Sequence, residues 1–186
     1  MTEPPDVVTD EAADEAVETM ITDEMRAVVG QVMSTSLAFP IAASDIRKWA
    51  LAIYFPAIPP RVFWDEDYAA TTRHGGIVAP EEFNPFAWMA REPGPGARPA
   101  RFGDFEGVFG IAPPPYRAVL QSKVTARYSG VRMRPGDVIH STDRIANYYE
   151  RQGRMGLQLY TVVSVAYENQ HGEWIKTVDT EFVRYR

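Results

Sequence analysis

The chain has 186 residues, of which 45% are hydrophobic, and this composition predicts a single globular domain with a sizeable core. It contains no cysteine, so disulfides and thiolate chemistry are excluded. The net charge of −6 is divided unevenly, because residues 1–25 carry nine acidic side chains and no basic one, while the remaining residues carry a net charge of +3. We therefore expect an acidic, mobile tail over residues 1–25 and a folded domain over residues 26–186.

The composition also narrows the partners and the location. The arginines form no dense stripe, so we expect no nucleic-acid partner. Three scattered histidines lack the spacing of metal ligands, so we expect no metal ion. No apolar run is long enough to cross a membrane, and the acidic amino-terminal residues do not resemble a signal peptide. These features predict a cytoplasmic protein without a membrane partner.

The first structured region predicts one strand and two helices. Residues 37–41 are typical of a short strand. Ser44 is a favourable N-cap, and apolar residues recur at helical spacing over residues 45–54, which predicts an amphipathic helix. The prolines that follow prevent a helix or a central strand. Asp65 then caps a second short helix over residues 66–74.

The segment after this helix organises the rest of the chain. Gly75 and Gly76 end the second helix, three apolar residues follow, and Pro80 is favoured at the first position of a third helix. Phe83 begins the apolar face of that helix. Two interpretations stay open: a buried helix after a glycine stop, or bare N–H groups from Gly75 to Ala79 that bind a ligand's carbonyl at a helix start.

A long loop over residues 92–115 contains six prolines and five glycines, with Phe102, Phe105 and Phe109 between them. Loops of this length inside a compact domain are usually functional or disordered. The aromatic side chains indicate either a flap that packs on the surface or a wall of a ligand site.

The carboxyl-terminal third predicts an antiparallel sheet. A basic turn over residues 151–154 and a turn over residues 169–172 separate segments with the alternation of strands. The short connections favour antiparallel pairing. The predicted class is α+β, with one apolar helix wrapped by the sheet. The predicted strands span residues 118–129, 138–150, 157–167 and 174–185.

Several motifs, in this order along residues 30–185, resemble the MaoC-like dehydratase family, which has the hot-dog fold. They are SDIRKWALAI leading to WDEDYA, then HGGIVAPEEF, and finally RPGDVI, ERQGRMG and YENQHGEW. The resemblance is strongest to the amino-terminal, non-catalytic half of double-hot-dog and two-chain hydratases. It implies a single hot-dog domain in this chain.

The resemblance also indicates that the catalytic residues are missing. Catalytic halves of the family carry an Asp and a His that activate the water added to C3 of a 2-enoyl-CoA. When WDEDYA is aligned on Asp65, these positions fall on Ile58 and Phe63. Neither side chain transfers a proton, and residues 49–64 contain no Asp, Glu or His at all.

The implied function is that of a pocket-forming subunit of a heteromeric 2-enoyl-CoA hydratase or 3-hydroxyacyl dehydratase. The implied partner is a catalytic MaoC-like chain that carries the Asp/His dyad. The implied substrate is a bulky acyl-CoA, with steroid side-chain thioesters as one example, and no cofactor is implied. The expected substrate-binding residues are Gly75, Gly76, Ile77, Val78, Ala79, Phe83, Phe102, Phe105, Arg151 and Arg154.

Alternative functions stay open at this point. Glu81 or Glu82 is the candidate acid of a homodimeric acyl-CoA thioesterase, although both also suit the dipole of a helix start. His74 is a weaker candidate base. Arg151 and Arg154 have the forked donors that bind CoA phosphates, or they lie in a solvated turn. A third alternative is an acyl-CoA-binding scaffold without a reaction of its own.

Overall fold

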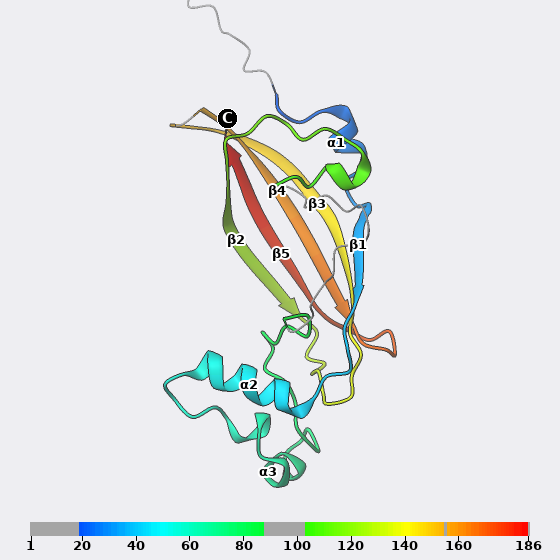
Figure 1. The fold of residues 1–186 in the computed structure, drawn as a ribbon, viewed down its shortest axis with the longest axis vertical. Helices are drawn as coiled ribbons and strands as arrows, with labels where there is room; N and C mark the ends of the chain where they lie inside the picture. Colours follow the sequence, from blue (N-terminus) through cyan, green and yellow to red (C-terminus); the bar gives the residue numbers. More distant parts are fainter. Residues whose placement is uncertain (1–18, 88–102, 155, 186) are drawn as a thin grey trace, which may run out of the picture.

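The computed structural model describes residues 19–87, 103–154 and 156–185 (Figure 1). Its centre is a five-stranded antiparallel sheet in the order β1-β3-β4-β5-β2, so β1 and β2 form the two edges. The antiparallel α+β prediction is therefore confirmed. The strands are β1 (Val32–Leu37), β2 (Ala118–Tyr128), β3 (His140–Gly153), β4 (Gly156–Glu168) and β5 (Trp174–Tyr185).

The helices are short and lie at the two ends of the sheet (Figure 1). One end carries α1 and the single-turn 3₁₀ helix η2, and the other end carries α2, η1 and α3. This separation gives the molecule two packed ends joined by the sheet. The bounds are α1 (Asp23–Ala27), α2 (Ala43–Tyr54), η1 (Arg61–Phe63), α3 (Glu66–Thr71) and η2 (Gly107–Phe109).

The two predicted helices near the amino terminus are confirmed, with changes at their ends. The Asp65 side chain caps α3 by accepting a hydrogen bond from the Tyr68 N–H at 3.0 Å. Helix α3 ends at Thr71, earlier than expected. The N-cap of α2 is Ala42 rather than Ser44, and no side chain caps it. Ile46 and Ala50 are buried, as the periodicity predicts.

The prediction of a helix beginning at Pro80 is wrong for the described residues. Residues 81–87 form turns, and the continuation from residue 88 lies outside the described ranges. Pro85 explains part of this result, because its ring removes a helical hydrogen bond in what would be the second turn. None of the described helices lies across the face of the sheet, so the described residues do not contain the predicted central helix (Figure 1).

Two strand predictions also need correction. Strand β1 covers Val32–Leu37 rather than residues 37–41, because Pro40 cannot donate to a strand ladder. Strand β3 continues to Gly153, so Arg151 belongs to a strand, and of the predicted turn over residues 151–154 only Arg154 lies outside it. The turn over residues 169–172 is confirmed, and Gly172 has a φ of 77°.

Each end of the molecule has its own hydrophobic core. At the α2 end, helices α2 and α3 pack with residues 77–79 and Phe83. At the α1 end, Met25 packs against β3 and β4. Met20 and Ile21 are also buried, so the packed part of the chain begins before residue 26, where charge composition alone places the domain start. Among the described residues, no helix is both long and apolar enough to cross a bilayer.

Candidate functional site

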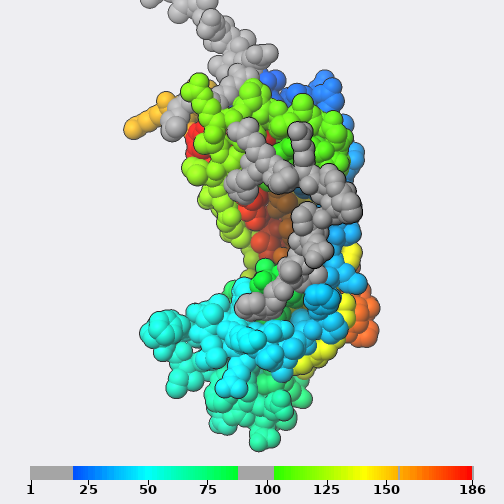
Figure 2. All heavy atoms as spheres, viewed as in Figure 1, coloured from blue at the N-terminus to red at the C-terminus, as the bar shows by residue number. Residues whose placement is uncertain are grey.

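One face of the sheet, here called the inner face, carries side chains that contact both packed ends. Lys176 and Arg184 of β5 point to this face, and strand alternation places Val178 and Thr180 between them. Their partners on β4 are Val165 and Val163. Figure 2 shows a hollow between the two ends, with β4 and β5 at its floor. All four side chains are half-buried, and three of them are valines, so the floor is mainly apolar.

The positions aligned with the catalytic dyad hold residues that cannot act in proton transfer. Ile58 is 83% exposed, while Phe63 is buried in the α2-end core with its ring centre 6.0 Å from that of Tyr54. Asp65 is engaged elsewhere: it caps α3 and accepts two hydrogen bonds from Arg61. The Tyr68 N–H and then Arg61 lower the pKa of the Asp65 carboxyl, so Asp65 stays ionised and does not serve as a general acid.

The segment after α3 does not present a row of bare N–H groups. The Ala79 N–H donates to the Met133 carbonyl at 2.8 Å, and the Val78 N–H donates to the Val62 carbonyl at 3.4 Å. Ile77, Val78 and Ala79 are all buried, so their side chains belong to the core. The interpretation of bare N–H groups that bind a ligand's carbonyl is therefore wrong at Val78 and Ala79. A ligand role of these residues through packing stays a prediction.

The glycine pair before this segment has two different roles. Gly75 has a φ of 66°, a left-handed conformation that favours glycine, so the predicted glycine stop is explained there. Gly76 has no such constraint, and a Cβ atom added to it would meet nothing within 4 Å. Open space therefore lies beside Gly76.

Phe83 is a core residue whose carbonyl, rather than its ring, contacts a functional group. The ring lies edge-on to Trp49, with centres 5.7 Å apart. The Phe83 carbonyl accepts a hydrogen bond from Lys176 Nζ at 2.7 Å, and the Glu81 carbonyl accepts a second at 3.1 Å. Lys176 also lies over the Tyr167 ring. Burial lowers the pKa of Lys176 to about 8.

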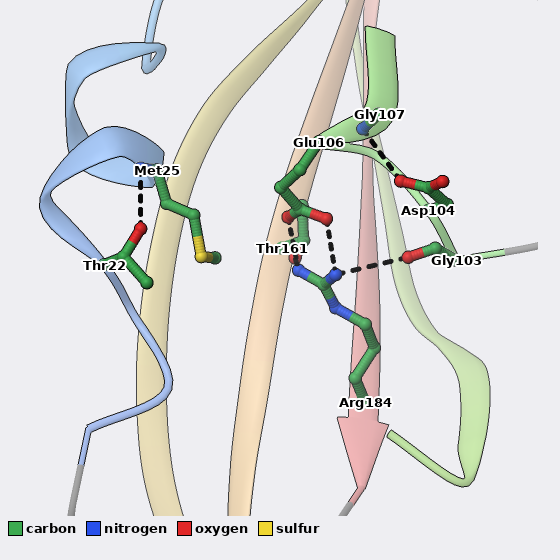
Figure 3. A network of polar contacts seen from close by, with 8 residues as sticks. All are labelled: Thr22, Met25, Gly103, Asp104, Glu106, Gly107, Thr161 and Arg184. Atoms are coloured by element: carbon green, nitrogen blue, oxygen red, sulfur yellow. Dashed lines mark hydrogen bonds and ion pairs between the residues drawn. The ribbon is translucent and has the colours of Figure 1, made fainter. Parts of the chain in front are cut away.

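A buried ion pair closes the other end of the inner face (Figure 3). Arg184 donates from Nη1 and Nη2 to the two Glu106 carboxylate oxygens, both at 2.7 Å, and both side chains are fully buried. Arg184 donates further to Thr161 Oγ1 and to the Gly103 carbonyl. Asp104 accepts from the Gly107 N–H and so fixes the turn that carries Glu106. The network joins β4, β5 and residues 103–107 into one unit.

Two features show how closely this end is packed. A Cβ atom added to Gly103 would lie 2.3 Å from Val119 Cγ2, so no other residue fits at position 103 without movement. Tyr148 lies in the same interior, where burial and then the negative charge of Glu106 raise the pKa of its hydroxyl. Tyr148 is therefore neutral across the working pH range.

The aromatic loop is only partly described. Phe105 packs against Phe182 of β5 with ring centres 4.9 Å apart, and its ring also faces Arg184. Phe102 and residues 92–101 lie outside the described residues. For Phe105, the interpretation of a segment packed against the sheet is confirmed, and its role as a pocket wall stays a prediction.

The structure separates Arg151 and Arg154 from the α2 end. The β3–β4 hairpin that holds them lies at the α1 end (Figure 1). The Arg151 guanidinium lies over the rings of Tyr149 and Tyr160, which are stacked 4.6 Å apart. The Tyr149 hydroxyl donates to Glu181, and this stack lies on the outer face, opposite Arg184. Binding of CoA phosphates by Arg151 and Arg154 stays a prediction.

The candidate thioesterase acids are not arranged around an open nucleophile site. Glu81 forms an ion pair with Arg132 at 2.7 Å, and both Glu81 and Glu82 are exposed in a turn rather than on a helix. Burial and then the positive charges of Arg73, Arg132 and Arg134 lower the pKa of His74. The lowered pKa of His74 therefore indicates a positive electrostatic field around its ring. It gives no specific support for a role as a catalytic base.

Sequence reasoning missed polar residues on the inner face. Asp143 of β3 accepts a hydrogen bond from Ser34 of β1 at 2.9 Å. Burial, together with the charge of Asp143, raises the pKa of the Tyr167 hydroxyl. Lys176, Arg184 and Glu106 were missed as well. The available signal was the alternation of side chains along a strand. Lys176 and Arg184 lie an even number of residues from Val178 and Phe182, so all four point to the same face of the sheet.

The fold and these residues agree with a known protein family. Residues 27–178 match the family model described as the FAS1-like, dehydratase domain region. The match spans most of the sequence, so the chain belongs to this family of MaoC-like dehydratases. The comparison with curated proteins gives no match.

Solved structures show the same fold at low sequence identity. A chain of the ChsH1–ChsH2 complex from Mycobacterium tuberculosis is 19% identical, with a TM-score of 0.64 over 87% of this chain and 88% of that chain. A HadBC chain, from a 3R-hydroxyacyl-ACP dehydratase of the same organism, is 16% identical, with a TM-score of 0.53 over 81% and 96%. The R-hydratase PhaJ1 from Pseudomonas aeruginosa is 16% identical, with a TM-score of 0.52 over 85% and 82%. The hot-dog prediction is confirmed.

The described residues define what this chain offers chemically. They contain no cluster of three or more His, Cys, Asp or Glu side chains placed to hold a metal ion. The residues offered instead are an apolar sheet floor, two buried cations at its ends, and open space beside Gly76. Such a surface can hold and orient an acyl chain, and neither Ile58 nor Phe63 has a side chain that transfers a proton.

Proposed function

We propose that this chain is the pocket-forming, non-catalytic subunit of a two-chain 2-enoyl-CoA hydratase or 3-hydroxyacyl dehydratase. The observation that carries the proposal is the pair Ile58 and Phe63, one exposed and one buried, in a segment without Asp, Glu or His. Family membership supports the reaction class, and the two-chain complexes among the structural relatives support a heteromeric assembly.

The reaction divides naturally between two such chains. Hydration adds the hydroxyl of water to C3 of the enoyl thioester and a proton to C2, and dehydration reverses both steps. A partner with an Asp/His dyad activates the water and moves the proton. This chain contributes apolar surface from β4 and β5, which orients the acyl group. The apolar side chains of β4 and β5 at the floor of the hollow suit an acyl group, and the family resemblance makes a bulky one, such as a steroid side chain, the candidate (Figure 2).

The free edge of β2 is the surface that best suits a second hot-dog chain. This strand bonds only to β5, so its other side leaves a row of backbone donors and acceptors unpaired within the sheet. Leu120 is 57% exposed and Val124 is 51% exposed along it. The carboxyl end of α2 extends past this side of the sheet, and Phe55 just beyond it is 83% exposed (Figure 1). An edge-to-edge partner would cover both surfaces.

Co-expression tests the division of labour. The purified chain alone should not consume an enoyl-CoA, whereas the chain together with a catalytic MaoC-like partner should, as followed by loss of the enoyl absorbance. A partner whose dyad is replaced serves as the control and should abolish turnover in the complex. Robust hydration by this chain alone would overturn the proposal, and acyl-CoA binding without any effect on the partner's rate would favour a scaffold.

The space beside Gly76 gives a more specific test. Gly76→Val keeps an allowed backbone conformation and places a branched side chain in the open space. We expect slower turnover of a bulky acyl-CoA by the complex, with less effect on a four-carbon enoyl-CoA and none on assembly measured by sedimentation. Equal losses for both substrates would mean that Gly76 does not line the acyl site.

A further inference from the structure

A cationic depression lies at the α3 end, far from the β3–β4 hairpin where phosphate binding was expected. Residues between Pro60 and His74 line it, among them Arg61, Tyr68 and Arg73, and its volume is about 380 Å³. That volume lies within the range of roughly 300 to 1,000 Å³ typical of ligand sites. We refer to it as the Arg73 depression.

The guanidinium groups around the depression differ in how their charge is balanced. Arg61 is neutralised by Asp65, to which it donates from Nε and Nη2 at 2.9 and 2.6 Å, and its guanidinium covers the Tyr68 ring. Arg73 is different, because within the described residues no carboxylate forms an ion pair with it. Its Nε lies 3.5 Å from His74 Nε2, so a neutral imidazole holds its position without cancelling its charge.

A second cation, Arg134, adds to the positive electrostatic field at His74. Arg134 comes from the loop between β2 and β3, and its Nη1 donates to the His74 carbonyl at 2.7 Å. Within the described residues its guanidinium also lacks a carboxylate ion pair. The lowered pKa of His74 reports the combined effect, since burial and three nearby arginines all disfavour its charged form. One cation without a carboxylate ion pair among the described residues, Arg73, therefore lines the depression, and a second, Arg134, bonds to the backbone of His74 at its edge.

We propose that the Arg73 depression binds a phosphate group of the thioester carrier, with Arg73 as the main cation. The forked guanidinium suits phosphate oxygens, and an exposed cation without a carboxylate partner can bind one without breaking an existing ion pair. The chain runs from His74 directly into Gly75 and Gly76, so a carrier anchored at Arg73 lies beside the open space at Gly76. This inference rests on the proposed function for its choice of carrier.

Binding measurements on the full chain, alone and with its partner, test the proposal. Calorimetric titration with CoA should give a dissociation constant that rises about tenfold or more in Arg73→Gln, because a charge-assisted contact is lost. Arg73→Lys should retain part of the affinity, and added salt should weaken binding to the wild type. Arg26→Gln is the matched control, since Arg26 is an exposed arginine paired with Asp23 on α1, away from both the depression and β2.

Two further arms identify the source of the phosphate. Dephospho-CoA lacks the 3′-phosphate, so an equal loss of affinity in wild type and Arg73→Gln when it replaces CoA points to the diphosphate as the bound group. A phosphopantetheine-bearing carrier protein, compared with its unmodified form, tests the other common source. Binding of either carrier that depends on Arg73 supports the proposal.

A local readout separates phosphate binding from a general change in the protein. Bound phosphate should raise the pKa of His74, followed by the NMR shifts of its ring, because a negative charge beside the imidazole favours its protonated form. CoA affinity unchanged in Arg73→Gln, or lost instead in Arg154→Gln, overturns the inference. Arg73-dependent binding without hydratase activity in any complex leaves the inference standing and removes the proposed function.

Discussion

The two ends of the inner face each bury a cation on β5, and they stabilise it in different ways. Arg184 is fully buried and bonds to both oxygens of Glu106, with Thr161 as a further acceptor. Lys176 is 3% exposed and bonds to two backbone carbonyls. Within the described residues no carboxylate forms an ion pair with Lys176. The α1 end therefore buries a neutral ion pair, whereas the α2 end buries a charge without an ion-pair partner among the described residues.

This difference indicates how the stability of each end responds to mutation and to pH. The Arg184 network is neutral overall and joins three segments, so the loss of either Glu106 or Arg184 would leave the other as an unpaired buried charge. Lys176 retains a net charge whose burial is unfavourable, and carbonyl dipoles with the Tyr167 ring offset only part of that cost. We therefore expect the α1 end to depend on its ion pair and the α2 end to respond to pH.

The largest effect is expected from breaking the Arg184 pair. Glu106→Gln leaves Arg184 buried without its counter-ion and should lower the unfolding free energy by about 3–5 kcal/mol. Urea denaturation measures this loss. In Arg127→Gln, which breaks the exposed Arg127–Asp179 pair, the loss should stay below about 1 kcal/mol.

The double variant Glu106→Leu/Arg184→Met sharpens this test. It removes both charges together, so much of the lost stability should return, since an apolar pair does not require a counter-ion. If the Glu106→Gln variant is as stable as the Arg127→Gln variant, the buried ion pair does not stabilise this end of the molecule.

The next effect is a pH dependence that belongs to the Lys176 end. The pKa of Lys176 is about 8 in the folded chain and 10.5 for an ordinary lysine, so between these pH values the unfolded chain holds a proton that the folded chain has released. The unfolding free energy of the wild type should therefore rise over this range relative to Lys176→Met, by up to about 3 kcal/mol. Denaturation at several pH values measures the difference. Lys123→Met, at an exposed position of β2, should not change the wild-type pH profile, and parallel profiles for wild type and Lys176→Met would contradict the prediction.

The elements with strong local signals were predictable from the sequence. Asp65 as a helix cap, the turn ending at Gly172, and the apolar alternation of β4 all depend on residues close together in the chain. Strand β1 was displaced in the prediction because its serines carry little strand signal.

The polar contacts of the inner face depend on distant residues and were not predictable. Glu106 and Arg184 are 78 positions apart, and in sequence each is a charged residue typical of an exposed surface. The glycine stop at Gly75 was predictable from residue type, whereas the carbonyl partners of Val78 and Ala79 depend on how the loops pack. Local chemistry therefore indicated the family, which the family model confirms, whereas the missing dyad stays a prediction. Tertiary packing determined which cations are buried.

The smallest effect is expected on the outer face, where Arg151 lies over the stacked Tyr149 and Tyr160 rings. Arg151→Ala removes an exposed cation–π contact, so the unfolding free energy should fall by only about 0.5–1 kcal/mol in urea denaturation. Its CoA affinity should match that of the wild type, because the guanidinium is held by the rings at the end of the sheet opposite the Arg73 depression (Figure 1). A loss of CoA affinity in Arg151→Ala as large as in Arg73→Gln would instead assign the phosphate to the β3–β4 hairpin and reverse the functional roles of the two ends.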